Sequence, residues 1–175
     1  LPRAINSIIN QTYKRWELII WDDGSSDNTA DVVQKFNDER IIYFYDENHG
    51  KSYALNNSIR NAKGKFFAFI DDDDQWIPEK LEYQMDIFNR NKGVSIVFGN
   101  FRNYDLISNL VEVGFEKTRR GLNLLETRQS HNDVQIIEDG MPGALFFSNF
   151  IAFDTTVLLG DIFLSQENNY FNENL

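Results

Sequence analysis

The sequence contains no cysteine, so disulfide frameworks and zinc sites built on cysteine are excluded. It also lacks any apolar run close to the ~18 residues that a membrane-spanning helix needs, and no secretory signal peptide is visible. We therefore expect no membrane segment within this chain. The expected location is cytoplasmic, with any association with a membrane made through other parts of the full-length protein.

Basic side chains are scarce: 17 Lys and Arg stand against 27 Asp and Glu, for a net charge of −10. This acidity disfavours binding to nucleic acid through bulk charge, so no nucleic-acid partner is expected. An anionic ligand can still bind if a divalent cation lies between it and the protein. Hydrophobic residues make up 42% of the chain, which predicts a globular fold with a sizeable core.

The 175 residues fit a single domain. The chain starts with LPRAINSIINQ, a helical pattern that is already under way, and its polar tail SQENNYFNENL stops without a terminating element. We therefore expect one domain over residues 1–175 that is truncated at both ends.

Short apolar runs alternate with helical patterns through the first half of the chain. Buried strands read as such runs, whereas helices repeat their apolar residues every three or four positions. The alternation predicts an α/β fold with a mostly parallel central sheet and flanking helices. A hairpin is expected over 101–113. The expected strands are 16–21, 41–45, 66–70 and 94–99, and helices are expected over 2–10, after Thr29, over 51–62 and from Pro78.

Acidic clusters follow two of these expected strands. Asp22 and Asp23 come after WELIIW, and Asp71 to Asp74 come after FFAFI. Ligands of parallel α/β sheets bind beyond the carboxyl ends of the strands. The two clusters therefore indicate one ligand site at this edge.

The run of four aspartates fits a metal site. Asp71 and Asp73 would point to the same side if the strand alternation continued through them. Mg²⁺ prefers oxygen ligands and usually takes one or two carboxylates besides water and phosphate, which suits a metal–diphosphate site. The alternative is a solvated acidic turn in which Asp74 caps the helix from Pro78.

The other two candidates are weaker by themselves. The stretch DDGSSDNT also suits a turn in which Asp27 or Thr29 caps the next helix. Lys51 follows Gly50 at the start of an expected helix, where phosphate binds well, but an ordinary loop-to-helix junction has the same pattern.

Three stretches together resemble the family 2 glycosyltransferases: SIINQTYKRWELIIWDDGSSDNTADVV, NHGKSYALNNSI and GKFFAFIDDDDQWIPEKLEYQ. The resemblance is close over residues 1 to about 100 and looser over 143–175. It implies a Rossmann-like GT-A fold, with a nucleotide-binding half over 1–100 and an acceptor-side half over 101–175. It also implies an inverting transfer of sugar from a UDP-sugar to an acceptor hydroxyl, in polysaccharide or glycoconjugate synthesis.

The resemblance assigns roles to matched positions. Mg²⁺ or Mn²⁺ would be the cofactor, and the acceptor would be a glycan, a lipid-linked sugar or a protein. Asp72 stands where alanine is common in the family. The implied nucleotide-binding residues are Asp22, Asp23, Lys51, Asp71 and Asp72, and the implied metal ligands are Asp73 and Asp71.

Two elements of the family pattern are expected outside the chain. The first strand, whose turn cradles the base, would precede Leu1, and the general base would follow Leu175. Asp139, in EDG, is an alternative base within the chain.

Two other functions remain open from the sequence. A sugar-nucleotidyltransferase would usually show a Gly-rich basic phosphate loop near its start, and none is seen here. A non-catalytic nucleotide-binding domain would suit a chain that lacks its own base.

Overall fold

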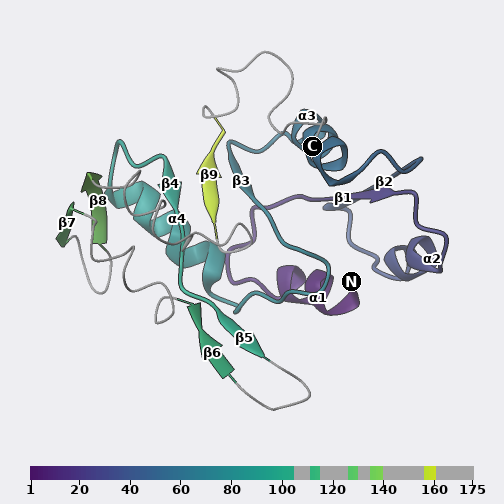
Figure 1. Cartoon of the computed structure of the whole chain (residues 1–175), viewed down its shortest axis with the longest axis horizontal. Coiled ribbons are helices and arrows are strands. Elements are labelled where there is room, and N and C mark those ends of the chain that lie inside the picture. Colours follow the sequence, from purple (N-terminus) through teal and green to yellow (C-terminus); the bar gives the residue numbers. More distant parts are fainter. Residues whose placement is uncertain (105–110, 115–125, 130–134, 140–155, 161–175) are drawn as a thin grey trace.

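A computed structural model of the chain describes residues 1–104, 111–114, 126–129, 135–139 and 156–160 (Figure 1). Helices and strands alternate through its first hundred residues, so the expected α/β class is confirmed. The helices are α1 (Pro2–Ile9), α2 (Thr29–Gln34), α3 (Lys51–Asn61) and α4 (Lys80–Arg90). The strands are β1 (Leu18–Asp23), β2 (Ile41–Asp46), β3 (Phe66–Ala68), β4 (Ile96–Val97), β5 (Arg102–Tyr104), β6 (Val111–Val113), β7 (Glu126–Gln129), β8 (Gln135–Asp139) and β9 (Val157–Leu159).

The strands form four small sheets, and the expectation of a mostly parallel central sheet is wrong for the described residues. Only β1 and β2 pair in parallel, in a register that places Asp23 opposite Asp46. β9 lies between β3 and β4 and is antiparallel to both. β3 and β4, which follow each other in the expected series, are therefore separated by β9, which comes more than fifty residues later in the chain. β5 and β6 form the expected antiparallel hairpin.

Helix α4 covers the three-stranded sheet (Figure 1). Leu81 and Phe88 on the helix are buried with Val97 of β4 and Val157 of β9. Burying side chains of this kind contributes roughly 1.5–3 kcal/mol each, so this cluster is a main source of the stability of this half.

Gln11 fixes the segment that leads into α4. Its side chain is 0% exposed, and its Nε2 donates to the carbonyl of Ile77 at 2.7 Å. Its Oε1 accepts the N–H of Leu81 at 3.0 Å. The helix begins at Lys80 and not at the expected Pro78, whose carbonyl instead accepts the N–H of Thr12 at 2.8 Å. The end of α1 thus holds the far end of the loop that carries the four aspartates.

The start of β1 is held in a similar way. Oε1 of Glu17 accepts the N–H groups of Lys63 and Gly64 at 2.6 and 2.9 Å, which joins β1 to the segment before β3. Helix α3 packs against β1 in the same region. These contacts place the amino-terminal end of α3, and so Lys51, near the carboxyl end of β1.

A cavity of about 990 Å³ lies between β1 and β3. Its walls are mostly apolar and include residues 18–21 of β1, 66–68 of β3 and parts of α1 and α3. The indole N–H groups of Trp16 and Trp21 are buried there without a hydrogen-bond acceptor among the described residues. On its side of the cavity, β1 has no paired strand in the described part of the chain.

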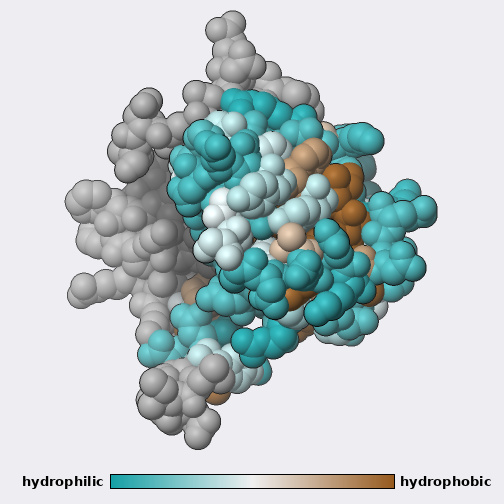
Figure 2. Space-filling view, turned by 90° about the vertical axis from the view of Figure 1, so that its right-hand side faces the viewer, coloured by the Kyte–Doolittle hydropathy of each residue, from teal (hydrophilic) through white to brown (hydrophobic). Residues whose placement is uncertain are grey.

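The exposed face opposite the α4 half is largely polar. Figure 2 shows hydrophilic residues over most of the described part of that face, beside one smaller hydrophobic area. In the parts of the chain that the structure describes, no helix is long and apolar enough to cross a membrane.

Candidate functional site

Asp22 is buried at the carboxyl end of β1, with 5% of its surface exposed. One carboxylate oxygen accepts the N–H of Ser25 at 2.8 Å, and the other accepts the hydroxyl of Tyr43. Burial raises the pKa of Asp22, but the hydrogen bonds from Tyr43 and Ser25 outweigh it, so the pKa lies below its usual value. Asp22 is therefore an ionised carboxylate whose two oxygens are already used by the protein.

Tyr43 is a partner that the sequence reading missed. Burial, followed by the hydrogen bond to Asp22, raises the pKa of the Tyr43 hydroxyl to about 12. A signal was available, because a tyrosine that is partly buried within the apolar run IIYFY usually has a hydrogen-bond partner for its hydroxyl. An acid at the end of the neighbouring strand is the obvious acceptor.

Asp23 binds the loop before α3. Its two carboxylate oxygens accept the backbone N–H groups of His49 and Gly50, each at 2.8 Å. The side-chain amide of Asn48 donates to the Asp23 carbonyl at 3.1 Å. Gly24 lies so close to this loop that an added Cβ would be 2.7 Å from the Asn48 nitrogen. The end of β1 and residues 48–50 therefore form one clamp.

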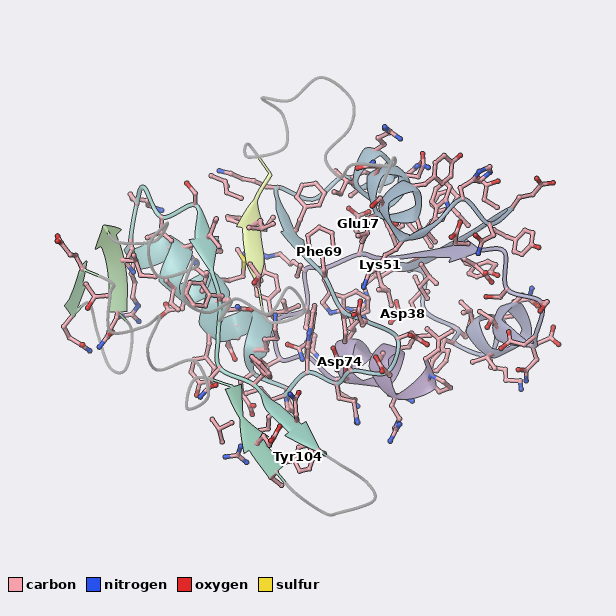
Figure 3. The ribbon with its side chains drawn as sticks, viewed as in Figure 1. Glu17, Asp38, Lys51, Phe69, Asp74 and Tyr104 are labelled. Atoms are coloured by element: carbon pink, nitrogen blue, oxygen red, sulfur yellow. The ribbon has the colours of Figure 1, made fainter. Side chains whose placement is uncertain are left out.

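Lys51 extends from the first turn of α3 toward the turn after β3 (Figure 3). Its ammonium lies 2.9 and 3.1 Å from the two carboxylate oxygens of Asp71. Both side chains are well exposed, at 68% for Lys51 and 53% for Asp71. An exposed ion pair of this kind is worth only about 0–1 kcal/mol, so it does little for stability and is easily exchanged.

The four aspartates lie in a turn and not in a continued strand. β3 ends at Ala68, and the N–H of Asp74 donates to the carbonyl of Asp71 at 3.1 Å. The expected strand alternation of Asp71 and Asp73 is therefore wrong. Asp74 does not cap α4, whose N-cap residue is Glu79.

The carboxylates of this turn suit a hard divalent cation. Asp71, Asp72 and Asp73 are all exposed, and hard cations prefer such oxygen ligands. Within the described residues, no three His, Cys, Asp or Glu side chains are arranged as a complete metal cage. Mg²⁺ needs only one or two carboxylates when a diphosphate completes its shell, so Asp71 and Asp73 fit this role.

The structure brings some of the expected site residues together and leaves others apart. Asp23, Lys51 and Asp71 form a connected series through the loop 48–50. Asp22 lies beside this series but faces Tyr43. Asp139 is the last residue of β8, paired with β7 in a separate sheet, and its side chain lies outside what the structure describes. The expected position of a base after Leu175 is also outside the described residues.

Comparisons with known proteins agree on the family. The model of glycosyl transferase family 2 matches residues 1–149. An Escherichia coli protein, "UDP-Glc:alpha-D-GlcNAc-diphosphoundecaprenol beta-1,3-glucosyltransferase WfgD", is 42% identical over 115 residues, which are 65% of this chain and 44% of that protein. An uncharacterized glycosyltransferase of Rickettsia conorii is 33% identical in an alignment 197 positions long that covers 95% of this chain and 32% of that protein.

A third relative is the putative teichuronic acid biosynthesis glycosyltransferase TuaG of Bacillus subtilis. It is 40% identical over 86 residues, which are 47% of this chain and 34% of that protein. The chain thus spans between a third and a half of the length of these relatives. The family model covers most of the chain and agrees with the motifs quoted above. The chain therefore belongs to glycosyl transferase family 2.

Proposed function

We propose that this chain is the donor-binding part of a glycosyltransferase with a GT-A fold that uses a UDP-sugar. The observation that carries the proposal is the series from Asp23 through the loop 48–50 and Lys51 to Asp71. It places a cation, at the start of a helix, and exposed carboxylates next to the ends of β1 and β3. These are the groups that a nucleotide diphosphate and its metal ion require.

Each group has a role in the proposed reaction. Asp71 and Asp73 would hold Mg²⁺ or Mn²⁺, and the metal ion would supply the positive charge that makes the diphosphate a better leaving group. Lys51 adds a second positive charge beside the phosphates. Asp22 and Asp23 keep the end of β1 and the loop 48–50 in place against the nucleotide, and Asp72 is available to the ribose hydroxyls.

The acceptor hydroxyl attacks the anomeric carbon from the side opposite to the leaving diphosphate, so the configuration inverts. A carboxylate must remove the proton of that hydroxyl as the new bond forms. We place this base in the part of the whole protein that follows residue 175, and Asp139 remains a second candidate.

We further propose glucose as the sugar and a lipid-linked saccharide as the acceptor. The support is the name of the WfgD relative, which specifies UDP-Glc and alpha-D-GlcNAc-diphosphoundecaprenol. The name of the TuaG relative adds teichuronic acid biosynthesis as a second setting. A cytoplasmic enzyme that meets a lipid-linked acceptor works at a membrane surface.

Thermal unfolding with UDP and Mn²⁺ tests the donor site. UDP is expected to raise the unfolding temperature only when Mn²⁺ or Mg²⁺ is present, because binding to the folded state stabilises it. Asp73→Ala should remove this dependence on metal, and Asp31→Ala, an exposed acid on α2, should keep it. Equal stabilisation of wild type and Asp73→Ala would contradict the assignment.

Transfer of radiolabelled sugar by the whole protein tests the reaction. A panel of nucleotide-sugars with a lipid-linked saccharide acceptor should give product with UDP-glucose. Release of pyrophosphate from a nucleoside triphosphate and a sugar phosphate would instead indicate a nucleotidyltransferase. Binding of UDP without transfer or hydrolysis of any donor would indicate a non-catalytic binding domain.

A further inference from the structure

Lys51 occupies the place of a cation at the candidate metal site. Its ammonium contacts both oxygens of Asp71, one of the two carboxylates proposed to hold the metal ion. A lysine ammonium is a compact point charge with three donors, so it can bridge two carboxylate oxygens much as a metal ion does. An ammonium and a divalent cation that lie against the same two oxygens repel each other, so each weakens the binding of the other.

Asp23 determines where Lys51 begins. The N–H groups that it binds belong to His49 and Gly50, the two residues directly before Lys51. Gly50 is the N-cap residue of α3 and has a φ of 93°, a left-handed conformation that glycine adopts readily. Holding these two N–H groups fixes the first turn of α3 and so limits the region that the Lys51 side chain can reach.

We propose that Lys51 is an internal counter-ion of Asp71 that competes with the divalent cation, and that Asp23 is the positioning residue that keeps Lys51 at this place. This inference rests on the proposed donor site. With metal and nucleotide bound together, Asp71 would be a ligand of the metal ion, and the ammonium of Lys51 would have the diphosphate as its partner in place of Asp71. Metal alone offers Lys51 no such partner, so metal alone binds weakly.

Mn²⁺ binding to the whole protein without nucleotide tests the competition. Free Mn²⁺ is measured by electron paramagnetic resonance during a titration. Lys51→Met removes the charge but keeps the length of the side chain, and it should lower the dissociation constant roughly two- to fivefold, the range for an exposed ion pair. Lys35→Met removes the same charge from an exposed position at the end of α2 and should change the constant much less.

Asp23→Asn separates positioning from simple electrostatics. The substitution removes a negative charge near the site, which alone would weaken Mn²⁺ binding. It also loosens the loop, because an asparagine amide has one acceptor oxygen for two N–H groups. The proposal therefore expects tighter Mn²⁺ binding in Asp23→Asn, and no additional gain when it is combined with Lys51→Met. Asp23→Glu, which keeps the charge and shifts the carboxylate, should act in the same direction and serves if Asp23→Asn does not fold.

The outcomes separate this inference from the proposed function. Lys51→Met that binds Mn²⁺ no better than Lys35→Met overturns the competition. Weaker Mn²⁺ binding in both Asp23 variants, or additive effects with Lys51→Met, overturns the positioning role. Either result is compatible with a working glycosyltransferase. Absence of any Mn²⁺ binding, with or without UDP, would instead contradict the donor site itself.

Discussion

The two acidic clusters differ in what surrounds them. At the end of β1, the carboxylates of Asp22 and Asp23 accept hydrogen bonds from Ser25, Tyr43, His49 and Gly50. In the turn after β3, Asp71 to Asp73 are exposed. The described side-chain partner of Asp71 is Lys51, whose side chain is long and flexible. Carboxylates of the first kind hold the fold in place, whereas those of the second kind remain available to a ligand. The two clusters therefore look alike in the sequence but differ in their surroundings in the structure.

The largest effect is expected from a substitution in the turn after β3. Asp73→Ala should lower the rate of sugar transfer by at least about a hundredfold, because charge stabilisation at a leaving group is a large catalytic contribution. Its free energy of unfolding should change by no more than about 0.5 kcal/mol, as for other exposed positions. Initial rates and denaturant unfolding measure the two quantities. A large loss of stability would show that Asp73 stabilises the fold, as we expect for the acids at the end of β1.

For the acids at the end of β1, we expect a loss of stability. Asp22→Ala removes the hydrogen bond between the partly buried hydroxyl of Tyr43 and a charged carboxylate, and a bond of this kind is worth about 1.5–3 kcal/mol of unfolding free energy. Tyr43→Phe and the double variant complete a cycle measured by denaturant unfolding. Since the two groups contact each other, the double variant should be less destabilised than the sum of the single variants. Additive effects would contradict a stabilising contact between them.

The smallest expected effect concerns Asp38, just before β2. Hydrogen bonds from Arg40 lower the pKa of Asp38 to about 2, below its ordinary value of 3.8. The resulting stabilisation is fully present above the ordinary pKa and is lost as pH falls from about 4 toward 2. Denaturant midpoints at pH 5.5 and pH 3 should differ less in Asp38→Asn than in the wild type. If the two midpoints differ by the same amount in Asp38→Asn and in the wild type, Asp38 does not contribute to the loss of stability at low pH.

Local sequence patterns predicted those features that depend on neighbouring residues. The helices near residues 51 and 80, the hairpin of β5 and β6, and the acids at the ends of the apolar runs all follow from periodicity and turn chemistry. The places of Asp22 and Asp71 in two separate groups were not predictable in this way. That difference depends on Tyr43 and on Lys51, which lie about twenty residues from the acids they contact.

Contacts between distant segments account for the remaining errors. β9 enters between β3 and β4 from residues 157–159, and no property of the runs at 66–70 and 94–99 indicates such an insertion. The predicted start of α4 was wrong by two residues for the same reason, because Gln11 and Thr12 hold the segment before it. Pro78 is a favourable first residue for a helix, but its carbonyl accepts a hydrogen bond from Thr12, which lies 66 residues earlier in the chain.

The cavity between β1 and β3 has a consequence for handling the polypeptide of residues 1–175. A strand edge with free backbone groups is a template for pairing with another chain, and natural proteins usually cover or charge such edges. Here the edge of β1 faces an apolar space of about 990 Å³ with two indole N–H groups that lack acceptors in the described structure. An extended segment of another molecule that pairs with this edge would also cover the apolar walls of the cavity. Preparations of this polypeptide by itself should therefore associate as their concentration rises, despite a net charge of −10 that would otherwise keep the molecules apart.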